Sequence, residues 1–172
     1  DGSVTLNAAG TVSVSTGENA VYARSNGAKV NINATNVEIE STNIGGQPAH
    51  KGHAIYANSK GSEVNINATE NLTISAAEGK NAVKTDSNGY VNLSAGNTNG
   101  MAKATNEGNI VATGTVQGNF DVNADTLTVN TTGDKNQFGL FAQSDDEYLK
   151  ANNADPQTNV VNVKDLTVNS AG

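Results

Sequence analysis

Residues 20–34 read AVYARSNGAKVNINA, and residues 54–68, which lie 34 positions further along the chain, read AIYANSKGSEVNINA. Each copy continues into a second alternating segment, VEI at 37–39 and LTI at 72–74. Self-similarity at a fixed period of this size is the mark of a repeat architecture. One repeat unit therefore contains an A segment (VYA or IYA), a B segment (VNINA) and a C segment (VEI or LTI).

The repeat continues with drift along the rest of the chain. A and B segments recur at 82–85 with 91–95, and at 101–104 with 110–112, while B and C recur at 120–129 and 161–168. Residues 140–142 form a further A segment, and residues 4–14 supply the B and C segments of a first unit. Between 96 and 118 the register is least regular, because the C segment of the third unit is missing and residues 115–117 are extra.

Apolar and polar residues alternate within every segment, which predicts strands whose two faces differ. The inward face of the A segments is predicted to stack Val21, Ile55, Val83, Ala102 and Leu140, with Ala23, Ala57, Thr85, Ala104 and Ala142 beside them. Gly27, Gly61 and Gly89 lie at the corners, where positive φ values are needed. Helical spacing is missing. The prediction is an all-β fold, a right-handed parallel β-helix (solenoid) with three short strands per coil and about five coils.

The domain prediction is a single β-helix segment, residues 1–172, of a larger repeat protein. Two stretches interrupt the rhythm, at about 41–53 and about 143–158, and insertions of this kind in solenoids form loops. The chain has 35% hydrophobic and 4% aromatic residues, no Cys and, by count, 27 Asn. Asn is rare in ordinary strands, so this load is best accommodated by a fold that stacks Asn side chains.

Charge and hydropathy exclude several classes of partner. The formal net charge is −7 and the sequence pI is about 4.6, whereas nucleic acids and anionic membranes are bound by clustered Lys and Arg. No apolar run approaches the roughly 18 residues of a membrane span. We expect no nucleic acid partner and no direct membrane insertion by this segment.

Two outward columns are candidates for function. The A segments carry Tyr22, Tyr56, Lys84, Lys103 and Phe141 at one outward position. Aromatic residues are common where proteins contact partners, but neighbouring Tyr side chains also stabilise a sheet by stacking, so both readings stay open. The B segments carry Asn31, Asn65 and Asn92 at one outward position and Asn33 and Asn67 at the next, a predicted structural ladder of side-chain amides.

Catalytic residues, metal ligands and cofactors are predicted to be absent. His50 and His53 have no supporting Cys or carboxylate nearby in the sequence, and the acidic run at 145–147 lacks the glycine and alternating oxygens of an EF-hand loop. Polysaccharide-active β-helix enzymes need clustered carboxylates, whereas Glu38 and Glu40 are followed in the next unit by Thr and Ser. The chain has a single Arg, Arg24.

The repeats at 20–34 and 54–68, together with the Asn-rich and Cys-free composition, resemble passenger domains of bacterial type V secreted proteins, the autotransporter adhesins and filamentous-haemagglutinin-like exoproteins. This resemblance implies a β-helix displayed at the bacterial outer membrane. It also implies a role in attachment, with a host-surface protein or glycan, or like molecules on neighbouring cells, as partner. The alternatives are a carbohydrate-active β-helix enzyme, a polysaccharide lyase or hydrolase, and a pure spacer stalk.

Overall fold

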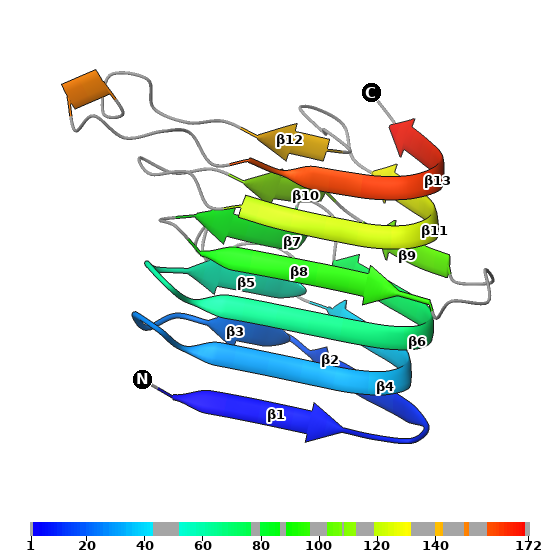
Figure 1. Ribbon diagram of the computed structural model, residues 1–172, viewed down its shortest axis with the longest axis horizontal. Coiled ribbons are helices and arrows are strands. Elements are labelled where there is room, and N and C mark those ends of the chain that lie inside the picture. Colours follow the sequence, from blue (N-terminus) through cyan, green and yellow to red (C-terminus); the bar gives the residue numbers. More distant parts are fainter. Residues whose placement is uncertain are drawn as a thin grey trace.

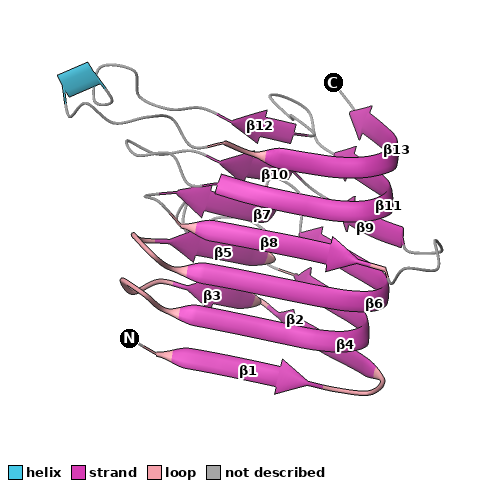
Figure 2. Ribbon diagram, in the orientation of Figure 1, coloured by secondary structure: helices cyan, strands magenta, loops and turns pink. Residues whose placement is uncertain are grey.

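The computed structural model describes residues 2–42, 52–76, 80–86, 89–96, 103–107, 109–112, 119–131, 140–142, 150–151 and 158–170. Most of these residues lie in strands that form two sheets (Figures 1 and 2). Lys150 and Ala151 lie in a short helical turn. No helix within these ranges is long and apolar enough to cross a membrane.

The two sheets are both parallel. The larger one has eight strands, ordered β1 (Ser3–Asn7), β4 (Lys29–Ser41), β6 (Glu63–Ala76), β8 (Tyr90–Ala95), β11 (Asn119–Thr131) and β13 (Val160–Ser170), with β2 (Thr11–Thr16) beside β4, and β9 (Lys103–Glu107) paired to both β6 and β11. The smaller one has five strands, ordered β12 (Leu140–Ala142), β10 (Asn109–Ala112), β7 (Asn81–Asp86), β5 (Ile55–Asn58) and β3 (Val21–Ala23). The all-β, parallel part of the prediction is therefore confirmed.

The chain alternates between the two sheets. From β3 onward each strand of the smaller sheet is followed by one or two strands of the larger sheet, and the next strand returns to the smaller sheet beside its predecessor. Parallel neighbours need such a crossover connection, because a tight turn joins only antiparallel strands. In Figure 1 the strands of the smaller sheet accordingly lie behind the long strands of the larger one.

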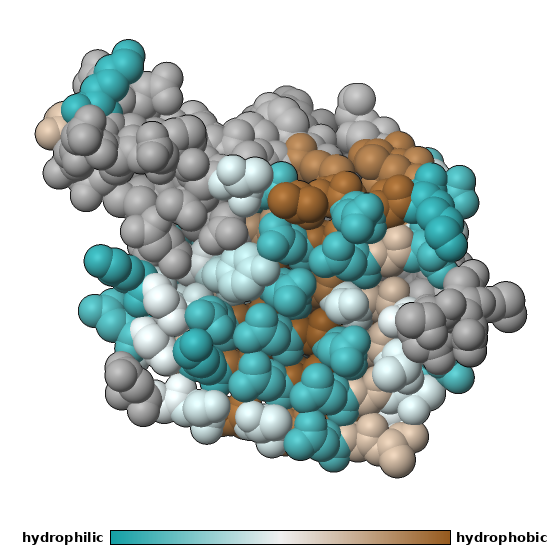
Figure 3. Space-filling view, viewed as in Figure 1, coloured by the Kyte–Doolittle hydropathy of each residue, from teal (hydrophilic) through white to brown (hydrophobic). Residues whose placement is uncertain are grey.

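Pairing brings like residues together. Val30 pairs with Val64, which in turn pairs with Val91. In the same way Ile32 pairs with Ile66, and Ile66 pairs with Leu93. The intervening outward positions hold polar side chains, so hydrophilic surface covers most of the face over β4, β6 and β8 in Figure 3. Burial along β8 alternates strictly between intermediate and buried residues, as expected for a strand with one face on a core.

In several repeat units the predicted B and C segments form one strand. They run without a break through the 13 residues of β4 and the 14 residues of β6, which differs from the prediction of two separate strands. The pairing register between these strands shifts between Ala34 and Asn36. Such an irregularity lets a strand bend without losing its ladder, and Figure 1 shows the long strands curving at this end of the sheet.

The register predicted for residues 101–112 is wrong. Lys103 was expected in the outward column of Tyr22, Tyr56 and Lys84, but it lies on β9 in the larger sheet, where it pairs with Asn71 and Thr126. Strand β9 is therefore the C segment that the third unit lacked. The next A segment is β10, so Ile110 and Ala112 take the positions expected for Ala102 and Ala104.

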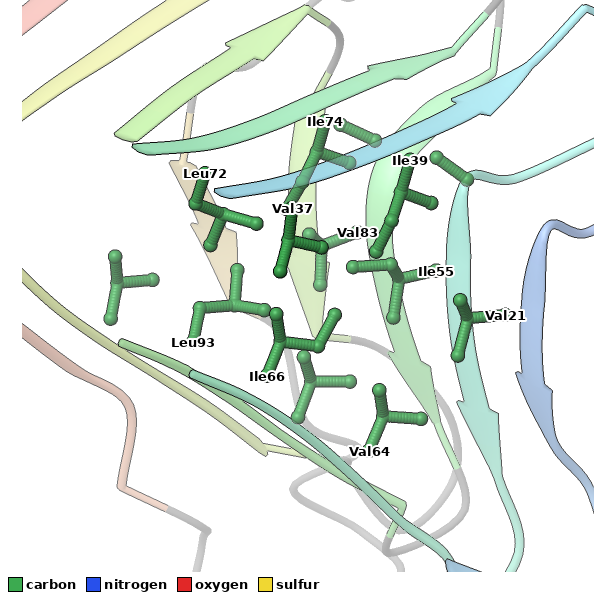
Figure 4. Packing of buried hydrophobic residues seen from close by; sticks show 14 of the residues in the cluster. Val21, Val37, Ile39, Ile55, Val64, Ile66, Leu72, Ile74, Val83 and Leu93 are labelled. Carbon is green, nitrogen blue, oxygen red and sulfur yellow. The ribbon is translucent and has the colours of Figure 1, made fainter. Parts of the chain in front are cut away.

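The core lies between the two sheets and runs along the whole stack. Its buried side chains are mostly Val, Ile, Leu and Ala, and ten of them are labelled in Figure 4. Strands of the larger sheet contribute Ile32, Ile66 and Leu93, each 1% exposed. Facing them, Ile55 and Val83 from the smaller sheet are fully buried. Each fully buried side chain of this size contributes roughly 1.5–3 kcal/mol relative to an exposed one.

Apolar residues become exposed at the two end strands of the stack. Val4 on β1 is 54% exposed, and Leu166 on β13 is 48% exposed. Figure 3 shows hydrophobic surface gathered near β13. This is the pattern of a repeat stack in which each strand is covered only by its neighbours.

The predicted loops fall largely outside the described residues, since 43–51, 143–149 and 152–157 are not described. Within the first stretch, Ser41 is buried at the end of β4, and Gly52 and His53 are buried before β5. His50 and the acidic run at 145–147 lie outside the described residues, as do residues 115–117.

Gly89 lies where the backbones of two neighbouring repeat units approach each other closely. A Cβ atom at this position would overlap the carbonyl oxygen of Ala57 and lie 3.0 Å from the amide nitrogen of Asn58. Gly89→Ala is therefore expected to lower the free energy of unfolding by about 1–3 kcal/mol. Urea denaturation followed by circular dichroism measures the change.

The matched control is Gly17→Ala, because a Cβ at Gly17 would meet nothing within 4 Å. This variant should stay within about 0.5 kcal/mol of the parent. Equal stability of the two variants would contradict the close approach of Gly89 to β5.

Candidate functional site

The outward column of the smaller sheet contains the aromatic residues singled out from the sequence. Tyr22 on β3 pairs with Tyr56 on β5, and Tyr56 pairs with Lys84 on β7. The column continues through Val111 on β10 to Phe141 on β12, for which backbone pairing alone is described. The structure thus brings Tyr22, Tyr56, Lys84 and Phe141 into one column and excludes Lys103.

Tyr56 is the centre of a compact polar and aromatic cluster. Its ring stacks on that of Tyr22 with centroids 5.1 Å apart and planes 3° from parallel. His53 packs edge-on at 5.3 Å, and the Lys84 ammonium lies 5.2 Å from the ring centroid on a cation–π approach. We call Tyr22, His53, Tyr56, Lys84 and Asp86 the Tyr56 cluster.

The Asp86 carboxylate contacts the polar groups of both Tyr56 and Lys84. The Tyr56 hydroxyl donates to Asp86 Oδ2 at 2.5 Å and accepts a hydrogen bond from Asn58 Nδ2 at 2.9 Å. The Lys84 ammonium lies 3.9 Å from the same carboxylate oxygen. The other oxygen, Oδ1, is buried and has no hydrogen-bond partner among the described residues. The carboxylate therefore depends on Tyr56 and Lys84 for its stabilisation.

Burial and Asp86 shift the ionisation of the cluster. Burial, the Asp86 hydrogen bond and the Asp86 charge all raise the pKa of the Tyr56 phenol well above its usual value. Burial also raises the pKa of Tyr22 and lowers that of Lys84, while the Asp86 charge partly offsets the effect on Lys84. The Tyr56–Asp86 pair thus keeps the proton on the phenol, which suits a structural hydrogen bond rather than proton transfer at neutral pH.

The sequence places Tyr56 at an outward, exposed position of its column, but in the structure its side chain is buried. It is 1% exposed, whereas Tyr22 is partly exposed and the Lys84 side chain is 17% exposed. A central position explains the burial, because Tyr22 covers one side of the ring, Lys84 the other, and His53 its edge. Of the two readings that the sequence left open, stacking within the sheet is the one that this geometry supports for Tyr56.

The Asn positions of the B segments lie next to one another across the larger sheet. Asn65 Nδ2 donates to Asn31 Oδ1 at 3.0 Å, and Asn31 Nδ2 donates to Thr5 Oγ1 at 3.3 Å. In the next column Asn33 Nδ2 donates to Asn7 Oδ1 at 2.9 Å. Asn92 pairs with Asn65, and Asn67 with Asn33, in the strand register. These bonds link consecutive repeat units through side chains as well as backbone.

Sequence reasoning missed two further links between units. Asn71 Nδ2 donates to Asn36 Oδ1 at 2.8 Å where the long strands bend. Tyr90, at the start of β8, donates to Asp121 Oδ2 at 2.7 Å. The recurrence of Asn 35 residues apart was a signal for the first. No repeat signal marks the second, because Tyr90 and Asp121 occupy different positions in their units.

In the part of the chain that the structure describes, no three His, Cys, Asp or Glu side chains lie close enough together to hold a metal ion. His53 is 3% exposed, and its Nδ1 accepts a hydrogen bond from the Asn81 amide at 3.2 Å. This contact gives His53 a role in joining two units. Glu40 accepts a hydrogen bond from Ser15 at 2.8 Å, so this acid also links neighbouring strands.

Comparisons of the chain with protein-family models, curated proteins and solved structures found no match in any of the three.

The Tyr56 hydroxyl is predicted to stabilise the fold. Tyr56→Phe removes the donor to Asp86 and should lower the free energy of unfolding by roughly 2 kcal/mol, as expected when a buried charged group loses a hydrogen bond. Tyr22→Phe is the matched control, because Tyr22 contributes its ring to the same stack and should change stability by less than about 0.5 kcal/mol. Urea unfolding of both variants tests this, and equal losses would contradict the role of the Tyr56–Asp86 bond.

Alkaline pH is predicted to remove the contribution of the Tyr90–Asp121 hydrogen bond to the free energy of unfolding. Burial and the Asp121 hydrogen bond raise the pKa of Tyr90 to about 12, compared with about 10 in an unfolded chain. The folded state therefore favours the protonated phenol, so this stabilisation is fully present below pH about 10 and is lost as the pH rises through about 12. Unfolding free energies of the parent and of Tyr90→Phe should converge over this range. A constant difference between them would count against the shift.

Proposed function

We propose that the chain is a stretch of a right-handed parallel β-helix with about five coils, and that it acts as a surface-exposed adhesin or structural passenger segment in attachment. The regular alternation between two parallel sheets supports the helix, since crossovers between parallel strands are right-handed in nearly all proteins. Each coil then has three straight segments, of which the second and third are joined in the long strands. The resemblance of the repeats to type V passenger domains supports display at a bacterial cell surface.

One observation carries the attachment function: a stable core leaves a regular outward lattice of polar side chains. Asn33, Asn67 and Glu38 are exposed on the larger sheet, while the alternate residues of the same strands are buried. Equivalent groups recur at the separation of neighbouring strands, roughly 4.8 Å. A surface of this kind offers many similar weak contacts, whose combined effect exceeds that of any one of them.

The contact face proposed is the outward side of the larger sheet. The aromatic column is a weaker candidate, because Tyr56 is buried and stacks within the sheet. The partner is a host-surface protein or glycan, or a like molecule on a neighbouring cell, for which the resemblance is the support. Self-association of such segments would hold cells together, as in a biofilm.

Beads coated with residues 1–172 test this proposal. They are expected to bind epithelial cells or one another more than albumin-coated beads do. Asn67→Arg introduces a large charged side chain at an exposed position in the middle of the contact face and should reduce attachment several-fold. Asn26→Arg makes the same change at an exposed position in the turn between β3 and β4, outside the larger sheet, and should leave attachment intact.

Circular dichroism of both variants confirms that they are folded. Beads that bind neither cells nor one another would identify the segment as a spacer and contradict the proposal. Equal loss in the two variants would contradict the choice of face.

A further inference from the structure

Two shallow hollows occur at the same place in the repeat, where the long strands of the larger sheet bend. Each has a volume of about 330 Å³, at the lower end of the roughly 300–1,000 Å³ of ligand pockets. The first hollow is lined by Asn7, Asn33, Asn67, Thr35, Thr69 and Ala34. The second is lined by Asn123, Asn162, Ser94, Asp125, Lys164 and Ala124.

The hollows repeat one surface. Asn33 pairs with Asn67, Asn67 with Ser94, and Ser94 with Asn123 in the strand register. Equivalent side chains therefore follow one another along the stacking direction at the separation of neighbouring strands, roughly 4.8 Å. A ligand that fits such a row is an extended polymer whose own units repeat at a similar distance. The rise of one sugar in an extended β-linked glycan is close to this spacing.

Charge favours a neutral ligand. The described residues that line the first hollow are all Asn, Thr or Ala. In the second, Lys164 Nζ lies 2.7 Å from Asp125 Oδ1, so the two charges compensate each other. An acidic polysaccharide would need unpaired cationic side chains along its path, and the described lining residues offer none.

The linings provide the groups that recognise hydroxyls. A side-chain amide has two N–H donors and a carbonyl acceptor. Asn33 uses one donor on Asn7 at 2.9 Å, and Asn162 uses one on Asn123 at 3.4 Å. Each of these donor amides thus retains a second N–H, and the exposed methyl group of Ala9 in the first hollow offers apolar contact for the carbon face of a sugar ring.

An extended peptide fits this surface less well. Peptides that add to sheets bind through an unpaired strand edge. At the hollows β4 pairs with β1 on one side and β6 on the other, and β11 pairs with β8 and β13. Their backbone groups are already used, so side chains alone are offered to a ligand.

We propose that the bend of the larger sheet binds a neutral, linear, β-linked glycan along the stacking direction, with its sugars seated in the two hollows. This inference deepens the proposed attachment function by naming the chemistry of the partner. The binding itself is measured with soluble sugars and does not need attachment to occur.

Isothermal titration and saturation-transfer NMR with cellohexaose and chitohexaose test the proposal on residues 1–172. At least one of these neutral hexasaccharides is expected to bind, while a heparin hexasaccharide and a neutral peptide of Ser, Thr and Ala are not. Asn33→Ala combined with Asn67→Ala should weaken sugar binding about tenfold, since two hydrogen-bonding amides are lost. Asn31→Ala combined with Asn65→Ala removes two ladder amides outside the hollows and should leave affinity within about twofold.

Should the first double variant fail to fold, Thr69→Trp fills the hollow from an exposed position and should abolish binding. The proposal is overturned if neither neutral hexasaccharide binds, or if the heparin fragment or the peptide binds at least as tightly. Equal affinity of the two double variants also overturns it. If coated beads attach but no sugar binds, the attachment function stands and the glycan proposal is rejected. If a sugar binds but coated beads do not attach, the glycan proposal stands and the attachment function is rejected.

Discussion

In-register parallel pairing of like residues is the interaction on which the rest of the structure depends. Because side chains alternate between the two faces of a strand, a slip by one residue would turn Ile32 and Ile66 outward and carry Asn33 and Asn67 into the core. The correct register instead extends the apolar core and the Asn31–Asn65 hydrogen bond from one unit to the next. Core packing and surface chemistry are therefore set by the same pairing.

The sequence predicts this architecture well where a unit contains long side chains and poorly where it contains small ones. The VNINA segments specify their register because Val and Ile fill the core and Asn does not. Residues 101–112 do not specify their register in this way. Met101-Ala102-Lys103-Ala104 matches the pattern of an A segment, but Ala104 pairs with Leu72 and Leu127 in the larger sheet. Burial of Tyr56 could not be predicted either, because His53, from the predicted loop at 41–53, covers the edge of a ring that Tyr22 and Lys84 of the neighbouring units cover on its two sides.

Side chains on the outward sides of the two sheets are not all exposed to solvent. On the smaller sheet the Tyr56 cluster, in which Tyr56 and His53 are buried, shifts the pKa values of its Tyr and Lys members, and its contacts join consecutive units. On the larger sheet the outward amides and hydroxyls stay accessible, and at the bend they surround two hollows with compensated charge. The physical difference between these faces, rather than the presence of aromatic residues, is what directs the functional proposals to the larger sheet.

Disulfide trapping measures the register most directly, because the chain contains no Cys. Asn33→Cys with Asn67→Cys joins two outward positions that pair across β4 and β6, where neighbouring strands lie roughly 4.8 Å apart, and a disulfide needs Cα atoms within about 7 Å. Oxidation should cross-link this pair in the folded, monomeric chain. Asn33→Cys with Asn65→Cys places the second thiol two residues out of register, beyond that limit, and should remain reduced. Cross-linking of the second pair in preference to the first would contradict in-register parallel stacking.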